Sequence, residues 1–428
     1  VLILFSLIFY AWGEPVYLLL MIASAAVNWY FGLLIERRRK KIFLILALVL
    51  DLGCLAVFKY AGFFVENLNA VFGASIPVPQ IALPIGISFY TFQALSYTVD
   101  VWRGDVPAQR SFAKLLLYIS LFPQLIAGPI VRYSDVAAQI DDRQFDASEA
   151  FYGATRFCIG LAKKVLLADA AGKVASQILD GSLASNTTVA AWLGILLYTF
   201  EIYFDFSGYS DMAIGMGQML GFHFPENFNY PYTAASVTEF WRRWHISLTT
   251  WFREYLYIPL GGSRKGTWRT VRNIFLVWFC TGFWHGASWN FILWGLHFFV
   301  WLMLEKYLLR DFLQKLPSWL RHFYTLVVVF VGWGVFAMED LAGCAGYFKT
   351  CFGSGTLWSA ADGYYLTAYG LTLLLLTVGS TRLPRKVWDR LPERTRDLLG
   401  PLLMTAGLVI CTAYLVDGSY NPFLYFRF

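Results

Sequence analysis

Long apolar runs without charge are the feature that most constrains how this chain can fold. Residues 16–35 contain no charged side chain, and such a run is about as long as one bilayer crossing needs. Further apolar runs occupy residues 323–338, 366–379 and 399–416. Only 14% of the 428 residues are charged, against about 25% in a soluble domain. None of the runs alternates polar and apolar residues, so the sequence predicts an all-α polytopic membrane protein.

The positive charges predict which loops face the cytoplasm. The formal net charge is +6, but the bases gather in short loops, which indicates membrane topology and not nucleic-acid binding. Residues 36–41, 263–272, 305–321 and 382–396 are rich in Lys and Arg and are predicted to lie inside. Residues 339–363 hold three acids and one Lys, and are predicted to lie outside.

This charge pattern implies a helical hairpin. Since residues 263–272 and 305–321 are predicted on the same side, residues 273–304 should enter the membrane and return, with a turn near 282–286. About 30 residues at about 1.5 Å each are too few for two full crossings, so a re-entrant or kinked pair is expected. His285 would then lie near the apex, at membrane depth.

Helix breakers predict further irregular segments. Residues 83–105 begin with a Pro and a Gly and predict a bent or re-entrant helix, after an outer loop at 64–82. Residues 113–131 contain two Pro and a Gly near their end and predict a broken helix. Broken backbone is tolerated only where protein lines a cavity. Residues 151–179 predict one helix.

Carboxylates lie within the apolar segments. Glu201, Asp205 and Asp211 follow closely on one another, and Asp51 lies in an earlier span. Because ionised groups facing lipid are costly, these side chains should face the interior of the helix bundle. Either a polar network that locks helices together or a direct role in a site fits this pattern.

Two histidines are the strongest candidates for chemistry. His245 and His285 each follow a Trp in an apolar segment, and a buried imidazole stays neutral and suits general acid or base catalysis. Taken singly, each is more often a hydrogen-bonded structural histidine, but as a pair they indicate a site. No metal site is predicted, because HExxH is absent and His285 and His297 would point about 120° apart on a helix.

A Gly-rich basic turn at residues 261–266 lies between the two histidines. Arg264 and Lys265 there would suit a phosphate, although the turn may equally be read as one more positive-inside loop. The Walker pattern is absent, so hydrolysis of nucleoside triphosphates is not indicated. No GxSxG nucleophile motif occurs either.

The chain shows no internal repeat, low-complexity segment or soluble domain, and residues 1–428 are therefore predicted to form a single domain. Residues 1–9 are apolar and predict part of a first helix, and no cleavable signal sequence is recognised there. The six cysteines are scattered without metal-binding spacing.

Several long motifs resemble the membrane-bound O-acyltransferase (MBOAT) family, and within it the membrane subunits of alginate O-acetyltransferase systems. The resemblance covers nearly the whole chain. The motifs are IALPIGISFYTFQALSYTVDVWRG at 81–104, FPQLIAGPIVR at 122–132, FDFSGYSDMAIG at 204–215, FWRRWHISLTTWFREYLYIPLGGSRKG at 240–266, FWHGASWNFILWGLH at 283–297 and GSYNPFLYFRF at 418–428.

This resemblance implies a multi-helix bundle with re-entrant or broken helices around a central funnel or tunnel. The family's invariant histidine matches His285, and its second polar position matches His245. Arg264 and Lys265 would bind the donor. The residues implied to bind substrate or line the tunnel are Trp284, Trp244, Asn290, Arg242, Asp205, Ser207 and Asp211.

The implied reaction is O-acetylation of a polysaccharide outside the cytoplasm, such as alginate. An acetyl group would come from a cytoplasmic thioester, with acetyl-CoA as the donor substrate and with no bound cofactor or metal. A partner protein outside would complete the transfer, and nucleic acid plays no part. The chain would lie among the lipids of a bacterial cytoplasmic membrane.

Three alternatives remain open at this point. A D-alanyl transfer protein for teichoic acid, which takes its acyl group from a carrier protein, shares several of the motifs. A transporter would also use broken helices and buried carboxylates, although no inverted repeat is visible. A purely structural scaffold would not explain the two Trp-His pairs.

Overall fold

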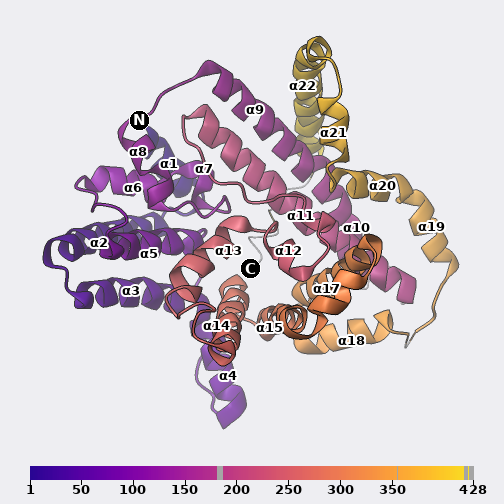
Figure 1. The fold of residues 1–428 in the computed structure, drawn as a ribbon, viewed down its shortest axis with the longest axis horizontal. Coiled ribbons are helices and arrows are strands. Elements are labelled where there is room, and N and C mark those ends of the chain that lie inside the picture. Colours follow the sequence, from indigo (N-terminus) through magenta and orange to yellow (C-terminus); the bar gives the residue numbers. More distant parts are fainter. Residues whose placement is uncertain (181–186, 354, 419–422, 424–428) are drawn as a thin grey trace. The chain divides into compact units, whose positions relative to one another are not determined.

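A computed structural model describes residues 1–180, 187–353, 355–418 and 423. Within these residues every named element is a helix, from α1 (Leu2–Gly13) to α22 (Glu393–Asp417) (Figure 1). The motif at 418–428 lies almost wholly outside the described residues. The all-α prediction is therefore confirmed.

Among the residues that the structure describes, six helical segments are long and apolar enough to cross a bilayer. Apolar runs of this length with few charged residues are what a multi-pass membrane protein requires. The span predicted at 16–35 is confirmed as a helix of 22 residues. The six candidate spans are Tyr17–Arg38, Lys41–Phe72, Thr188–Met219, Trp289–Lys315, Ser318–Ala337 and Glu393–Asp417.

Two compact units emerge from the packing of the chain. The first contains residues 1–154, 213–226 and 250–259, and the second contains residues 155–212, 227–249 and 260–428. All the candidate site residues belong to the second unit. The division describes helix packing, and the single-domain organisation stays a prediction.

The first unit is built around α5 (Ile87–Arg103), which is buried along nearly its whole length. Helices α2 (Tyr17–Arg38) and α3 (Lys41–Leu55) both pack against it, and α6 (Phe112–Ser120) packs against α2 (Figure 1). Beyond α6 the chain makes the short helix α7 (Phe122–Leu125) and then leaves helical geometry. The predicted break within residues 113–131 is therefore confirmed.

Two predictions for the first unit were wrong in detail. The outer loop expected at 64–82 is helical as far as Phe72, because a π-helical turn at Ala56–Tyr60 leads directly into α4 (Ala61–Phe72). Helix α4 ends only at Gly73, whose φ of 63° reverses the chain. Within residues 83–105, α5 runs unbroken from Ile87 to Arg103, because both breakers precede Ile87.

The second unit contains the helical hairpin that the charge pattern predicts. Helix α14 (Thr267–His285) and helix α15 (Trp289–Leu304) pack together, with the turn between them at 286–288. Their backbones approach closely, since a Cβ at Gly282 would lie 2.3 Å from the Phe291 carbonyl oxygen. Helix α15 also packs against α17 (Ser318–Ala337) and α18 (Leu341–Cys351).

The hairpin is longer than predicted. A π-helical turn at Glu305–Leu309 and helix α16 (Arg310–Lys315) extend its second arm to 27 residues. At about 1.5 Å per residue this arm is about 40 Å long, enough for a full crossing. The hairpin was expected to cross the bilayer only in part because it seemed too short, and that expectation fails. The turn between α14 and α15 brings the chain back, as the predicted hairpin requires.

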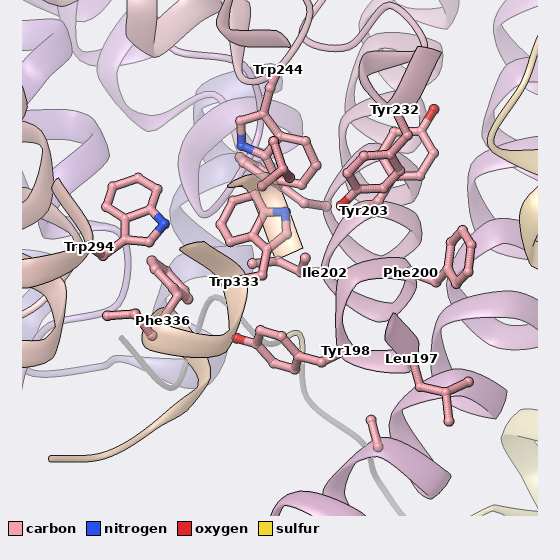
Figure 2. Packing of buried hydrophobic residues seen from close by; sticks show 14 of the residues in the cluster. Leu197, Tyr198, Phe200, Ile202, Tyr203, Tyr232, Trp244, Trp294, Trp333 and Phe336 are labelled. Carbon is pink, nitrogen blue, oxygen red and sulfur yellow. The ribbon is translucent and has the colours of Figure 1, made fainter. Parts of the chain in front are cut away.

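Aromatic rings fill the core of the second unit. The ring of Trp333 lies 4.7 Å from that of Trp244 and 5.9 Å from that of Trp294 (Figure 2). Trp241 meets Trp278 edge-on at 4.6 Å. Offset and edge-to-face pairs of this kind add to the stabilisation from burial alone.

We expect Gly282→Ala to destabilise the hairpin, because the new methyl group has no room beside the Phe291 carbonyl. Overpacking of this kind costs roughly 1–3 kcal/mol, which outweighs the gain of about 0.5–1 kcal/mol from a better helix former. Thermal unfolding in detergent measures the effect. The matched control is Gly407→Ala in α22, where no described atom lies within 4 Å of the added Cβ, and an equal loss in both variants would contradict the close helix crossing.

Candidate functional site

His285 is the last residue of α14 and lies at the tip of the hairpin. Its side chain is buried, with only 8% of the residue exposed. The imidazole meets the ring of Trp294 at 5.0 Å and that of Phe336 at 5.3 Å, both edge-on. Two aromatic rings from α15 and α17 therefore wall the histidine.

His245 joins helix α12 (Val237–Trp241) to helix α13 (Ile246–Phe252). Its φ is 43°, a left-handed conformation that is costly for a non-glycine residue and occurs often at functional sites. The residue is 1% exposed, and its ring lies 4.7 Å from that of Phe206 on α11 (Thr188–Met219). His245 lies outside the six candidate spans, and burial lowers the pKa of its imidazole to about 3, so the ring is neutral at physiological pH.

Trp284 brings the two histidines into one cluster. Its ring lies 5.0 Å from the imidazole of His285 and 6.2 Å from that of His245. These contacts link residues 40 positions apart in the sequence. The two Trp-His pairs of the sequence thus meet around a single indole.

Asn227 fixes the chain beside His245, although the sequence analysis did not select it. Its Oδ1 accepts hydrogen bonds from the N–H (3.2 Å) and the hydroxyl (2.9 Å) of Ser247, and its carbonyl accepts one from Ile246 N–H at 3.0 Å. Its Nδ2 donates to Ser210 on α11 at 3.1 Å. The only signal in the sequence is an amide within an aromatic run, which would not have identified this role.

Glu305 is a second residue that the sequence analysis missed. The carboxylate is buried and accepts hydrogen bonds from the N–H groups of Val237 (2.6 Å) and Thr238 (2.9 Å). Those groups begin α12, so the negative charge satisfies backbone donors that no helical carbonyl can reach. In the sequence, Glu305 lies in a loop predicted to be basic, where nothing indicates such a partner.

Asp205 and Asp211 form ion pairs on α11. Asp205 pairs with Lys164 at 2.8 Å, and Asp211 pairs with Lys163 at 2.6 Å and with Arg156 at 2.9 Å. Both lysines lie in the π-helical turn Lys163–Ala168 of a helix that runs unbroken through α9 (Ala147–Ala162) and α10 (Asp169–Leu179), as predicted for 151–179. These contacts support the interpretation that the carboxylates lock helices together.

The other predicted residues divide by burial. Trp244, Asn290 and Ser207 are buried, and Asn290 Nδ2 donates to the Met338 carbonyl at 2.6 Å. Arg242, Arg264 and Lys265 are exposed and therefore stand apart from the buried cluster. Each proposed role of these six residues stays a prediction.

Comparisons with known proteins show the family to which the chain belongs. Residues 103–345, more than half of the chain, match the MBOAT, membrane-bound O-acyltransferase family. A probable alginate O-acetylase from Azotobacter vinelandii is 44% identical over 87% of this chain and 76% of its own length. Another from Pseudomonas putida is 39% identical over 99% of this chain and 93% of its own length. A teichoic acid D-alanyltransferase from Bacillus subtilis is 30% identical over 50% of this chain and 56% of its own length.

The chain belongs to the membrane-bound O-acyltransferase family. It is therefore an enzyme that transfers an acyl group to a hydroxyl, and the transporter and scaffold alternatives are set aside. Both central histidines lie within the matched residues.

We expect Lys164→Met and Asp205→Asn each to destabilise the protein, because each breaks a buried ion pair. The loss should be smaller in Asp205→Asn, where Lys164 keeps its second partner, Asp169, at 2.8 Å. Breaking a buried pair from one side costs roughly 3–5 kcal/mol, and the double variant should lose less than the two single losses together. Thermal unfolding in detergent and acyl transfer per folded enzyme are the measurements. A double variant that is stable but inactive would instead assign Asp205 a direct role in the reaction.

Proposed function

We propose that this enzyme acetylates an extracytoplasmic polysaccharide of the alginate type. The acetyl group comes from a cytoplasmic thioester, acetyl-CoA, and a partner protein outside the membrane completes the transfer. The chain acts in the cytoplasmic membrane of a bacterium. The relatives named as probable alginate O-acetylases support this choice, because they match far more of the chain than the D-alanyltransferase does.

One observation carries the proposal: two buried histidines meet around one indole in a family of acyltransferases. A histidine that accepts a proton from a hydroxyl generates the nucleophile that an O-acyltransferase needs. The hairpin presents His285 at its tip, and the strained backbone at 245 fixes His245 against the same Trp284 ring.

In the proposed reaction His285 acts as the general base. An imidazole nitrogen takes the proton as the acceptor hydroxyl oxygen attacks the thioester carbonyl carbon. The tetrahedral intermediate then collapses, the carbon–sulfur bond breaks, and the imidazolium returns the proton to the leaving sulfur. The products are an acetyl ester and a free thiol, with no other co-reactant.

His245 has a different task in this proposal. As a neutral imidazole it carries one N–H, which can donate to the oxyanion of the intermediate or orient the acceptor hydroxyl. Burial lowers the pKa of this imidazole to about 3, so the ring stays neutral and keeps its N–H. The surrounding rings of Trp284, Trp294 and Phe336 exclude water, which would otherwise hydrolyse the thioester.

We expect His285→Ala to abolish release of free thiol from acetyl-CoA, because the acceptor hydroxyl loses its base. The loss should be in kcat, by at least about 100-fold, since general base catalysis contributes about 10² to 10⁴. Purified enzyme in detergent, with and without the partner protein and a polysaccharide acceptor, provides the assay.

His297→Gln is the matched control, because His297 is a partly buried histidine in the middle of α15 and bonds the Val328 carbonyl at 3.0 Å. It should keep most of the activity at equal folded protein. Full activity of His285→Ala would contradict the role of the base. If the wild type is active only with a carrier-bound D-alanyl donor, the reaction is D-alanyl transfer and not acetyl transfer.

A further inference from the structure

A basic cavity lies in the second unit, apart from the aromatic cluster around the histidines. Its volume is about 370 Å³, within the range of about 300–1,000 Å³ usual for small-molecule sites. Three chain segments meet there: the turn at 231–233, the residues just before His245, and the connection from α20 (Gly370–Gly379) into α21 (Leu383–Asp389). The lining residues are Thr233, Arg243, Thr381, Arg382, Leu383 and Lys386.

The cavity carries an excess of positive charge. Three cations line it, and one of them, Arg243, is paired with Glu239 at 2.5 Å. Within the described part of the chain, no carboxylate forms an ion pair with Arg382 or Lys386. The cations Arg382 and Lys386 therefore line a space large enough for a phosphorylated group.

The two arginines are held in place before any ligand binds. Arg243 donates to the Thr233 hydroxyl at 2.9 Å, and its carbonyl accepts the N–H of Asn229 at 2.9 Å. Arg382 donates to the Asn229 side chain at 3.1 Å and lies 5.6 Å from the centroid of the Tyr230 ring. Guanidinium groups fixed in this way recognise phosphate oxygens at a smaller entropic cost than free side chains.

We propose that this cavity binds the phosphate groups of the acyl thioester donor, the nucleotide end of CoA. This inference rests on the proposed function, which requires a thioester from the cytoplasm. Residues 382–396, which supply Arg382 and Lys386, form the loop that the charge pattern places on that side. Arg243 lies two residues before His245, so one short segment joins the cavity to the histidine cluster.

The site differs from the donor site that the sequence predicts at Arg264 and Lys265. Those two residues are neighbours on a single turn, and they are exposed, as Arg382 and Lys386 also are. At the cavity, cations from separate segments converge, as a compact polyanion requires. Nothing is formed or broken at this site, because the proposal concerns binding alone.

The test is titration of CoA, dephospho-CoA and pantetheine into the whole enzyme in phosphatidylcholine nanodiscs. We expect CoA to bind the wild type and the affinity to fall at least about tenfold in the R382Q/K386Q variant, since hydrogen bonds to charged groups contribute about 1.5–3 kcal/mol each. Pantetheine, which lacks the phosphates, should bind both proteins alike. The KM for acetyl-CoA should rise with kcat unchanged.

The matched control is R385Q. Arg385 lies on the same short helix, is exposed, and pairs with Asp389 without lining the cavity. CoA affinity should change less than about twofold in this variant. Equal CoA affinity in wild type and R382Q/K386Q, or an equal loss in R385Q, would overturn the proposal.

Two further outcomes would reassign the cavity. If CoA does not bind and the R382Q/K386Q variant retains less phosphatidylglycerol through purification, the phosphate belongs to a lipid headgroup. If only an acyl-loaded carrier protein binds, and its binding needs both Arg382 and Lys386, the assignment of the cavity to CoA is wrong.

CoA binding is measured without turnover, so a failure of this binding site can be told apart from a failure of the proposed function. Loss of CoA binding in R382Q/K386Q with no thiol release by the wild type would support the site and refute acetyl transfer from CoA. If the wild type releases thiol, but CoA binds equally to the wild type and to R382Q/K386Q, the result would support acetyl transfer from CoA and refute the site.

Discussion

Pairing of buried charges on one long helix supports the rest of the site. Helix α11 carries Asp205 and Asp211, and a charged side chain in apolar surroundings is tolerated only with a partner. Lys163 and Lys164 supply those partners and fix α11 to the helix before it. Because α11 also presents Phe206 to His245 and Ser210 to Asn227, the ion pairs determine where the histidine lies.

The segment that contains His245 has little regular secondary structure, and side chains from other parts of the unit hold it in place. Glu305 binds the beginning of α12, and Asn227 binds the beginning of α13. Between them the backbone passes through a left-handed residue, which isolated helices would avoid. Buried hydrogen bonds to polar side chains from elsewhere in the unit therefore stabilise a conformation that the local sequence does not favour.

Sequence reasoning recovered what local chemistry encodes. Apolar length gave the spans, the Pro and Gly residues around 123–129 gave the broken helix, and loop charge gave the hairpin that ends at His285. It failed where a tertiary contact decides. Nothing local marks Glu305 as a helix cap, since its partners lie 67 and 68 positions away. Helix α4 also continues to Phe72, because no helix breaker occurs between residues 64 and 72. The outer loop predicted at 64–82 therefore begins later than expected.

The close approach of Gly282 and Gly295 has a mechanical consequence. At this point α14 and α15 touch backbone to backbone with no side chain between them, so one arm cannot slide along the other without collision. The hairpin is thus a stiff rod with the imidazole of His285 fixed at its end. A displacement of the His285 backbone must therefore be a tilt of the whole rod, and a spectroscopic probe anywhere along it would report that tilt.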